Sequence, residues 1–232
     1  MSSSNRFVSI VLSAATVLSA VACSDSTSVG SGTVGVKLTN ASVAAAGVAA
    51  DLVGAQTEAP LPAGSVKSVD IFVVRIDARR AEPTEDEAAE ATEESASEGS
   101  GWVTLAEPNA TIDLMTLADG SSAFLGDAEV AAGAYNGFRL IIDPAKSSVT
   151  LNDEAGTVIG GESITGLKFP SAAQTGLKIN LSGGPVEVAD GGTSTLMVKF
   201  DVSKSFVVLG GSIEQNGLLF KPVIRGEQVV AP

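Results

Sequence analysis

Hydrophobic and polar residues alternate along most of this chain with the period of two that is typical of β-strands. The segment 33–39 shows the pattern clearly, because Val34, Val36 and Leu38 alternate with small or polar residues. Many short strands with little helix predict an all-β fold, which we expect to be an antiparallel β-sandwich of immunoglobulin-like or prealbumin-like type. Further strands are predicted at 66–79, 102–105, 111–114, 136–143, 149–151, 157–159, 177–181, 185–188, 193–201 and 218–226.

Two segments interrupt the strand pattern. Residues 43–63 are rich in alanine and are broken by glycine and proline, so we predict an insertion with an optional short helix at 48–56. Residues 81–101 carry many Asp and Glu side chains and no apolar stripe, which predicts a disordered acidic loop. Capture of a divalent cation is the alternative, although the spacing of a calcium-binding loop is missing.

The first residues of the chain have the organisation of an export signal. In segment 1–22 a charged start precedes an apolar stretch, and small residues come directly before Cys23. Cys23 is the one cysteine in the sequence, so we expect it to be a lipid attachment site. Residues 23–32 then form a flexible tether to a domain at 33–229. Ordinary secretion with an unmodified thiol is the alternative.

The expected location follows from this signal. Ser24 stands where an inner-membrane retention signal usually has Asp, which favours the outer membrane or the cell surface. We therefore expect a lipid-anchored protein of the cell envelope that contacts the membrane through Cys23.

Composition excludes several classes of function. The net charge of −13 argues against a nucleic-acid partner, because phosphate contacts need clustered Lys and Arg. The absence of His excludes Ser-His-Asp and Cys-His catalysis and imidazole-based zinc sites. We expect no catalytic residue, no metal and no cofactor.

One aromatic residue has a predicted structural role. Tyr135 follows Gly133 at the entry to a strand, a pattern that is typical of a tyrosine corner. In such a corner the phenol hydroxyl bonds to nearby backbone. We therefore interpret Tyr135 as part of the fold rather than as a catalytic group.

The segment 169–178 is the candidate ligand-binding loop. Ser171, Gln174, Thr175 and Lys178 could present hydrogen-bond donors and acceptors to a sugar or a peptide. The structural alternative is a turn whose hydroxyl groups bond to their own backbone. A Ser-Lys dyad is disfavoured, because the S-x-x-K spacing is missing.

Carboxylates near predicted strand ends form a second set of candidates. Asp201 is expected to cap a turn and to pair with Lys204, next to Ser205. Asp113, Asp143 and Asp201 could supply the two carboxylates of a hydrolase such as a glycosidase. Turn chemistry already accounts for Asp at each of these positions, so the hydrolase is a distant alternative.

Several segments together resemble a bacterial domain of unknown function, DUF4382, that occurs in predicted lipoproteins. The resemblance runs from Thr33 to about Val229. It departs at Asn40, where the pattern usually has Asp. The resemblance implies a β-sandwich outside the cytoplasm and no known reaction. Its landmarks are Gly35-Val36-Lys37-Leu38-Thr39-Asn40-Ala41, Gly133-Ala134-Tyr135 with Arg139-Leu140, Phe169-Pro170-Ser171 with Thr175-Gly176-Leu177-Lys178, Lys199-Phe200-Asp201-Val202-Ser203-Lys204-Ser205, and Leu219-Phe220-Lys221-Pro222-Val223-Ile224-Arg225.

Two functions fit these observations. The first is a noncatalytic binding module whose loops hold a carbohydrate, a peptide or an envelope partner. The second is a structural envelope component that associates through exposed sheet edges. A concave pocket with convergent polar groups would favour the first, and a bare edge strand or a broad apolar patch would favour the second.

Overall fold

The computed structural model describes residues 30–41, 59–62, 64–81, 101–161, 166–169 and 175–229. Several predicted features lie outside these residues: the signal peptide, Cys23, most of the tether, most of the alanine-rich and acidic segments, Ser171 and Gln174. The first strand begins at Ser31, two residues before the predicted start of the domain. Within the described residues, no helix has the length and hydropathy needed to span a bilayer.

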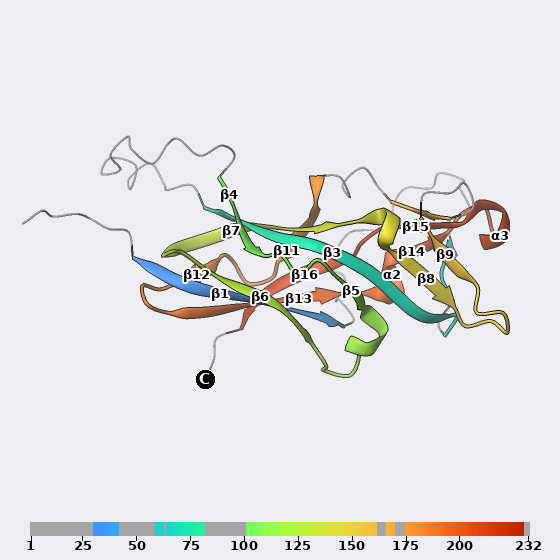
Figure 1. The fold of residues 1–232 in the computed structure, drawn as a ribbon, viewed down its shortest axis with the longest axis horizontal. Coiled ribbons are helices and arrows are strands. Elements are labelled where there is room, and N and C mark those ends of the chain that lie inside the picture. Colours follow the sequence, from blue (N-terminus) through green and yellow to red (C-terminus); the bar gives the residue numbers. More distant parts are fainter. Residues whose placement is uncertain are drawn as a thin grey trace, which may run out of the picture.

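The described residues fold mainly into β-strands, most of them short (Figure 1). Within the described residues, two 3-10 helices and two single-turn α-helices connect them. In chain order the elements are β1 (Ser31–Asn40), β2 (Ala59–Pro60), β3 (Val66–Arg80), β4 (Trp102–Ala106), β5 (Ala110–Asp113), η2 (Leu114–Leu117), β6 (Ala123–Ala131), β7 (Gly133–Ile142), η3 (Pro144–Lys146), β8 (Ser148–Leu151), β9 (Val158–Gly160), β10 (Leu167–Lys168), β11 (Leu177–Leu181), β12 (Val186–Val188), β13 (Thr193–Phe200), α2 (Val202–Ser205), β14 (Phe206–Val208), α3 (Ile213–Asn216), β15 (Leu218–Phe220) and β16 (Ile224–Val229).

A 12-stranded mixed sheet forms the body of the molecule. Its hydrogen-bonded path is β6-β1-β13-β16-β11-β7-β3-β8-β9, with β12 on β7 and with β4 and β5 on β3. The sheet curls so strongly that β4 comes alongside β6. A Cβ atom built on Gly126 of β6 would lie only 2.8 Å from the Cβ of Ala106 on β4. The result is a half-barrel that encloses an aliphatic core.

The structure is mostly β, as predicted, but the predicted antiparallel arrangement is wrong for three strand pairs. β1 pairs with β13 in parallel, β11 with β16, and β10 with β15. The curled mixed sheet also differs from two flat sheets packed face to face. Alternation along a strand specifies which side is buried, but it does not specify the neighbouring strand or its direction.

A smaller four-stranded sheet, in the order β10-β15-β14-β2, packs at one end of the half-barrel. The ring of Phe220 on β15 is the centre of its core. The ring centroids of Phe169, Phe200 and Phe206 lie 5.2, 5.8 and 5.3 Å from that of Phe220. Phe200 belongs to β13, so this aromatic cluster joins the small sheet to the large one.

The structure contains the predicted tyrosine corner but divides one predicted strand in two. The predicted tyrosine corner is confirmed, because the Tyr135 hydroxyl donates to the Ala131 carbonyl at 2.9 Å and the residue is 2% exposed. The predicted strand at 218–226 is divided into β15 and β16 by a break around Pro222. Proline has no backbone N–H to continue a ladder, which explains the break.

Candidate functional site

Thr175 and Lys178 are the members of the predicted binding loop that the structure describes, and both lie next to Arg139 of β7. Lys178 lies on β11, where its exposed side chain is directly opposite Arg139 of β7. Thr175 is exposed, and its carbonyl accepts a hydrogen bond from Arg139 Nη1 at 3.4 Å. Lys178 therefore lies on a sheet face, in the strand that was predicted at 177–181.

Asp201 forms the predicted pair with Lys204, but its side chain makes no capping hydrogen bond to α2. Lys204 Nζ lies 3.0 Å from Asp201 Oδ2, and the Ser203 hydroxyl donates to Asp201 Oδ1 at 2.5 Å. The Ser205 hydroxyl donates to the Asp201 carbonyl at 2.5 Å and accepts from the Val223 backbone N–H at 3.0 Å. The cluster ties the end of β13 to the segment before β16.

Asp113 and Asp143 each cap a 3-10 helix. Asp113 Oδ1 accepts from the backbone N–H groups of Met115 and Val69, at 3.0 and 3.1 Å. Asp143 Oδ1 accepts from the backbone N–H of Ala145 at 3.0 Å, and Asp143 Oδ2 pairs with Lys146 at 3.1 Å. The hydrogen bond from Lys146 lowers the pKa of Asp143. Both carboxylates thus have structural partners.

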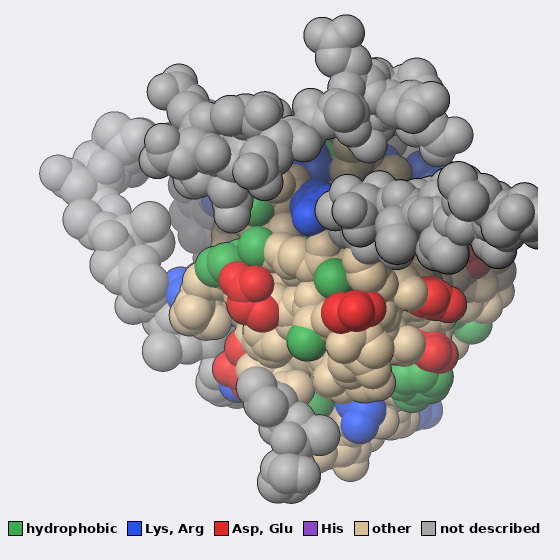
Figure 2. Space-filling view, turned by 90° about the vertical axis from the view of Figure 1, so that its left-hand side faces the viewer, with side chains coloured by type: hydrophobic (Ala, Val, Ile, Leu, Met, Phe, Trp, Pro, Cys, Tyr) green, Lys and Arg blue, Asp and Glu red, His purple; other side chains and the backbone are tan. Residues whose placement is uncertain are grey.

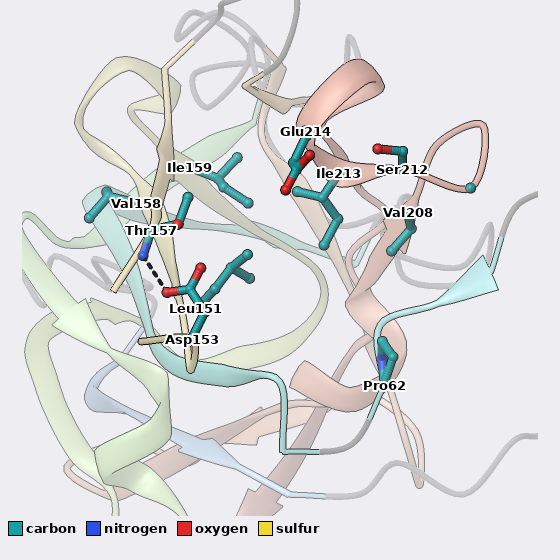
Figure 3. A pocket seen from close by; sticks show the side chains of 11 residues that line it. Pro62, Leu151, Asp153, Thr157, Val158, Ile159, Val208, Ser212, Ile213 and Glu214 are labelled. Carbon is teal, nitrogen blue, oxygen red and sulfur yellow. Dashed lines mark hydrogen bonds between the residues drawn. The ribbon is translucent and has the colours of Figure 1, made fainter. Parts of the chain in front are cut away.

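A cleft of about 680 Å³, which we name the hairpin cleft, opens between the β8–β9 hairpin and the segment from β14 to α3 (Figure 3). It combines an apolar lining with four polar side chains. The apolar residues include Leu151, Ile159 and Ile213. The polar side chains are those of Asp153, Thr157, Ser212 and Glu214.

The polar groups of the hairpin cleft come from two separate loops. Asp153 belongs to the β8–β9 turn, where its Oδ1 accepts from the Thr157 backbone N–H at 2.8 Å. Hydrogen bonds from the Thr157 side chain and backbone lower the pKa of Asp153, so its carboxylate stays charged in mildly acidic solution. Glu214 lies on α3 across the cleft, and its carboxylate points into the opening (Figure 3). A ligand in this cleft would meet negative charge from both sides.

A second cleft of about 610 Å³, the strand-end cleft, adjoins the first and shares Pro62 with it. It lies where the parallel strands β1 and β13 both end. Asn40 at the end of β1 is paired in register with Phe200, which places it beside Asp201. The other lining residues are Ala41, Leu61, Gly64, Val66, Met115, Ala118, Asp119, Gly120, Val202 and Ser203.

Side-chain hydrogen bonds hold one wall of the strand-end cleft in place. The Thr39 hydroxyl contacts the carbonyl oxygens of Leu117 and Ser121, at 3.2 and 2.7 Å. Between them, Asp119 has a φ of 58° and Gly120 a φ of 87°, so the chain turns sharply at the rim of the cleft. The wall is thus a fixed turn. Among the described residues, no three acidic or cysteine side chains are grouped to hold a metal ion.

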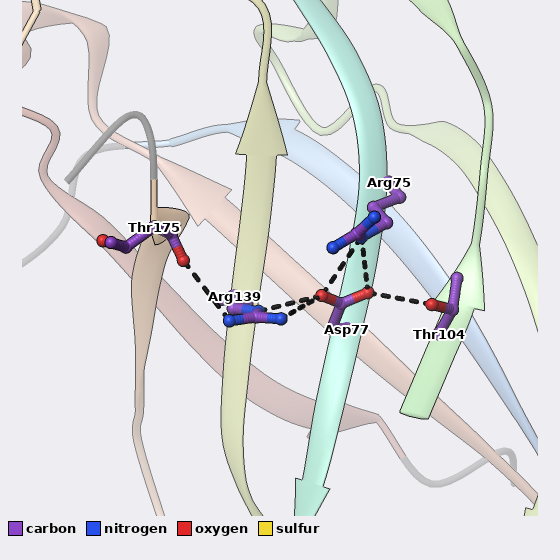
Figure 4. Close-up of polar contacts among 5 residues, drawn as sticks. All are labelled: Arg75, Asp77, Thr104, Arg139 and Thr175. Carbon is purple, nitrogen blue, oxygen red and sulfur yellow. Dashed lines mark hydrogen bonds and ion pairs between the residues drawn. The ribbon is translucent and has the colours of Figure 1, made fainter. Parts of the chain in front are cut away.

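A buried ion cluster on the outer face of the sheet was missed by sequence reasoning (Figure 4). Asp77 of β3 is 2% exposed, and its carboxylate is contacted by Arg139 at 2.8 Å and by Arg75 at 3.1 Å. The Thr104 hydroxyl of β4 donates to Asp77 Oδ1 at 3.0 Å. The guanidinium carbon of Arg139 also lies 4.3 Å from the ring centroid of Trp102. An Asp between two apolar positions of a long strand was the one sequence signal for this cluster.

The fold and the clefts together define a β-rich domain with a curled mixed sheet and two adjoining clefts at one end. A family model described as "Domain of unknown function (DUF4382)" matches residues 31–222, and the chain belongs to this family. No curated protein sequence and no solved structure matches the chain. The resemblance that the landmark segments indicated is thus confirmed at the level of the family.

Proposed function

We propose that this protein is a noncatalytic binding module whose ligand occupies the hairpin cleft and extends toward the strand-end cleft. The observation that carries the proposal is the convergence of Asp153, Thr157, Ser212 and Glu214 over an apolar floor. Ligand sites are commonly concave and mostly apolar, with a few polar groups that fix orientation. A concave pocket with convergent polar groups is the feature that we expected to favour a binding module over a structural component.

The lining favours a ligand that donates hydrogen bonds. Carboxylates accept from hydroxyl and ammonium groups, and charge-assisted bonds of this kind are the stronger ones. Aliphatic side chains such as Leu151 and Ile159 would contact the C–H surface of a sugar or the stem of a lysine. A neutral oligosaccharide or a lysine-containing peptide fits both requirements.

We also propose that the module works outside the cytoplasm, anchored to the membrane by lipid on Cys23. The support is the sequence before β1: a charged start, an apolar stretch and small residues directly before the one cysteine. A short tether would then hold the domain close to the outer membrane or cell surface.

Binding of two probe sets tests the ligand proposal. Mature full-length protein is titrated calorimetrically with neutral hexasaccharides and with lysine-containing decapeptides. We expect one set to bind and the double variant Ser212→Ala with Glu214→Gln to lose about tenfold in affinity. The matched control is Glu187→Gln on β12, at an exposed position outside both clefts. Equal affinity in the cleft variant and the control would overturn the proposal.

A structural envelope component is the second candidate, and the edge strands support it. β6 and β9 end the hydrogen-bonded path of the large sheet, and each carries an exposed hydrophobic residue: Phe124 is 60% exposed and Val158 is 64% exposed. Edge strands with such side chains pair readily with another chain. In contrast, the end of the molecule where β1 begins presents separated carboxylates, with scattered hydrophobic and cationic side chains between them (Figure 2). Sedimentation velocity of the wild type and of Phe124→Ser distinguishes the two functions. Self-association of the wild type that is lost in the variant would favour this second function.

A further inference from the structure

We propose that the outer face of the large sheet is a second binding surface, one that takes a linear, carboxylate-bearing polysaccharide. The surface is a row of cationic side chains, which we name the cationic band. It runs across five adjacent strands, and no residue of it lines either cleft. Its members are Lys199 of β13, Arg225 of β16, Lys178 of β11, Arg139 of β7, and Arg75 and Arg79 of β3.

Strand register places these residues on one face. Lys199 is opposite Arg225, and Arg225 is opposite Asn180 of β11. Two residues earlier on β11, Lys178 is opposite Arg139, which is opposite Asp77. Directly paired residues point to the same side of a sheet. Neighbouring strands lie about 4.8 Å apart, so the band extends for about 20 Å across the strands.

The band is positively charged, although the chain as a whole carries a net negative charge. The protein has 14 Lys and Arg residues against 27 Asp and Glu residues, yet six of the 14 lie in this one band. Among the residues that the structure describes, two carboxylates lie within it. Asp77 pairs with Arg75 and Arg139, and Glu227 pairs with Lys199 at 2.5 Å. Six cations against two carboxylates leave an excess of four positive charges.

Part of the band is held in position before any ligand arrives. Arg139 is fixed by Asp77, by the Thr175 carbonyl and by the ring of Trp102, and its side chain keeps 24% of its surface exposed. Arg79 approaches the same ring at 5.5 Å. A guanidinium group with a fixed orientation binds a carboxylate with little loss of rotational freedom. Trp102, which is partly exposed, adds a flat apolar surface beside these charges.

The geometry favours a narrow polymer over other polyanions. The sheet is strongly curled, so its outer face is convex, and a planar bilayer would touch only a strip of it. A flexible chain can follow the band from β13 to β3. The net charge of −13 repels a nucleic acid at long range, whereas a polysaccharide with separated carboxylates has a lower charge density. The surface therefore matches a uronate-containing glycan.

Binding to polygalacturonate oligomers tests the inference on the full mature chain. We expect affinity in about 25 mM NaCl that falls steeply by about 200 mM, because the contacts are ionic. Lys178→Gln should weaken binding about tenfold, and the double variant Arg79→Gln with Lys178→Gln should weaken it further. Lys67→Gln is the matched control, since Lys67 is an exposed strand lysine outside the band.

Three outcomes would overturn the inference. The first is an absence of binding to the charged oligomer, or equal binding to a neutral galactose oligomer. The second is an equal loss of affinity in Lys178→Gln and Lys67→Gln, with both variants melting as the wild type does. The third is preferential binding to vesicles of anionic lipid or to single-stranded DNA. These results are independent of the cleft titrations, so either proposal can fail alone.

Discussion

Arg139 of β7 and Asp77 of β3 form an ion pair across neighbouring strands, with Arg139 Nη2 at 2.8 Å from Asp77 Oδ2. The carboxylate is almost completely buried, although it lies on the outer face of the sheet, because the side chains of Arg75, Thr104 and Arg139 surround it. The pair therefore links the stability of the sheet to the shape of the cationic band.

Replacing this carboxylate should destabilise the fold. Asp77→Asn leaves two guanidinium groups without their partner, and we expect the free energy of unfolding to fall by about 2 kcal/mol. The value is below that of a fully buried pair because Arg75 and Arg139 are partly exposed. Urea denaturation measures the change. Asp70→Asn is the control on the same strand, with an expected cost under about 0.5 kcal/mol. Similar costs at the two positions would contradict the argument.

The tyrosine corner predicts a loss of stability at alkaline pH. Burial raises the pKa of Tyr135 above its ordinary value of 10.0. The folded state therefore holds the phenol proton more tightly than the unfolded state does. This contribution is fully present below pH 10.0 and is lost as the pH rises through the folded-state pKa.

Tyr135 is the one tyrosine of the chain, so ultraviolet absorbance of the phenolate reports its titration directly. Tyr135→Phe should cost about 1 kcal/mol at neutral pH, because the hydrogen bond to Ala131 is lost. The variant should also lose less stability than the wild type between neutral and alkaline pH. A phenolate titration at the ordinary pKa in the folded protein would refute this account.

The aromatic cluster predicts that the small sheet depends on one ring. Phe220 contacts three other phenylalanine rings and is fully buried, so Phe220→Ala should cost about 3–5 kcal/mol. Phe124→Ala is a matched control, because Phe124 is an exposed strand residue. It should cost under about 1 kcal/mol. Thermal denaturation of the two variants measures the difference. Equal shifts of the melting temperature would show that the aromatic cluster does not contribute more to stability than an exposed phenylalanine does.

Lipid attachment predicts a defined difference in mass. We expect the intact mass of membrane-bound protein to include several acyl chains on Cys23, and Cys23→Ser to release an unacylated protein into the soluble fraction. Mass spectrometry of both fractions measures this. A wild-type protein that is soluble and unacylated would disprove the anchor and leave a secreted domain with a free thiol.

Features that depend on neighbouring residues in the sequence were predictable. Alternation at 33–39 predicted β1, the spacing of Gly133 and Tyr135 predicted the corner, and Asp201 pairs with Lys204 three residues later. Each of these requires only local backbone geometry.

Features that depend on distant residues were not predictable in the same way. Asp77 owes its burial to Arg139, 62 residues further along the chain. Asp153 and Glu214 line opposite sides of the hairpin cleft. They do so because β14 and α3 return to the end of the molecule that holds β8 and β9. The strand at 177–181 was predicted, but its pairing with β7, which places Lys178 opposite Arg139, was not. Period-two patterns contain no information on which strands become neighbours.

The parallel pairing of β1 with β13 determines when the fold can be completed. More than 150 residues separate Asn40 from Thr193, the first residue of β13, so β1 emerges from the ribosome long before this partner exists. Contacts of such sequence separation form late and slow the folding reaction. A nascent chain can therefore pair β3 with β7 and β1 with β6 early, but the β13-facing edge of β1 stays unpaired until synthesis is almost finished.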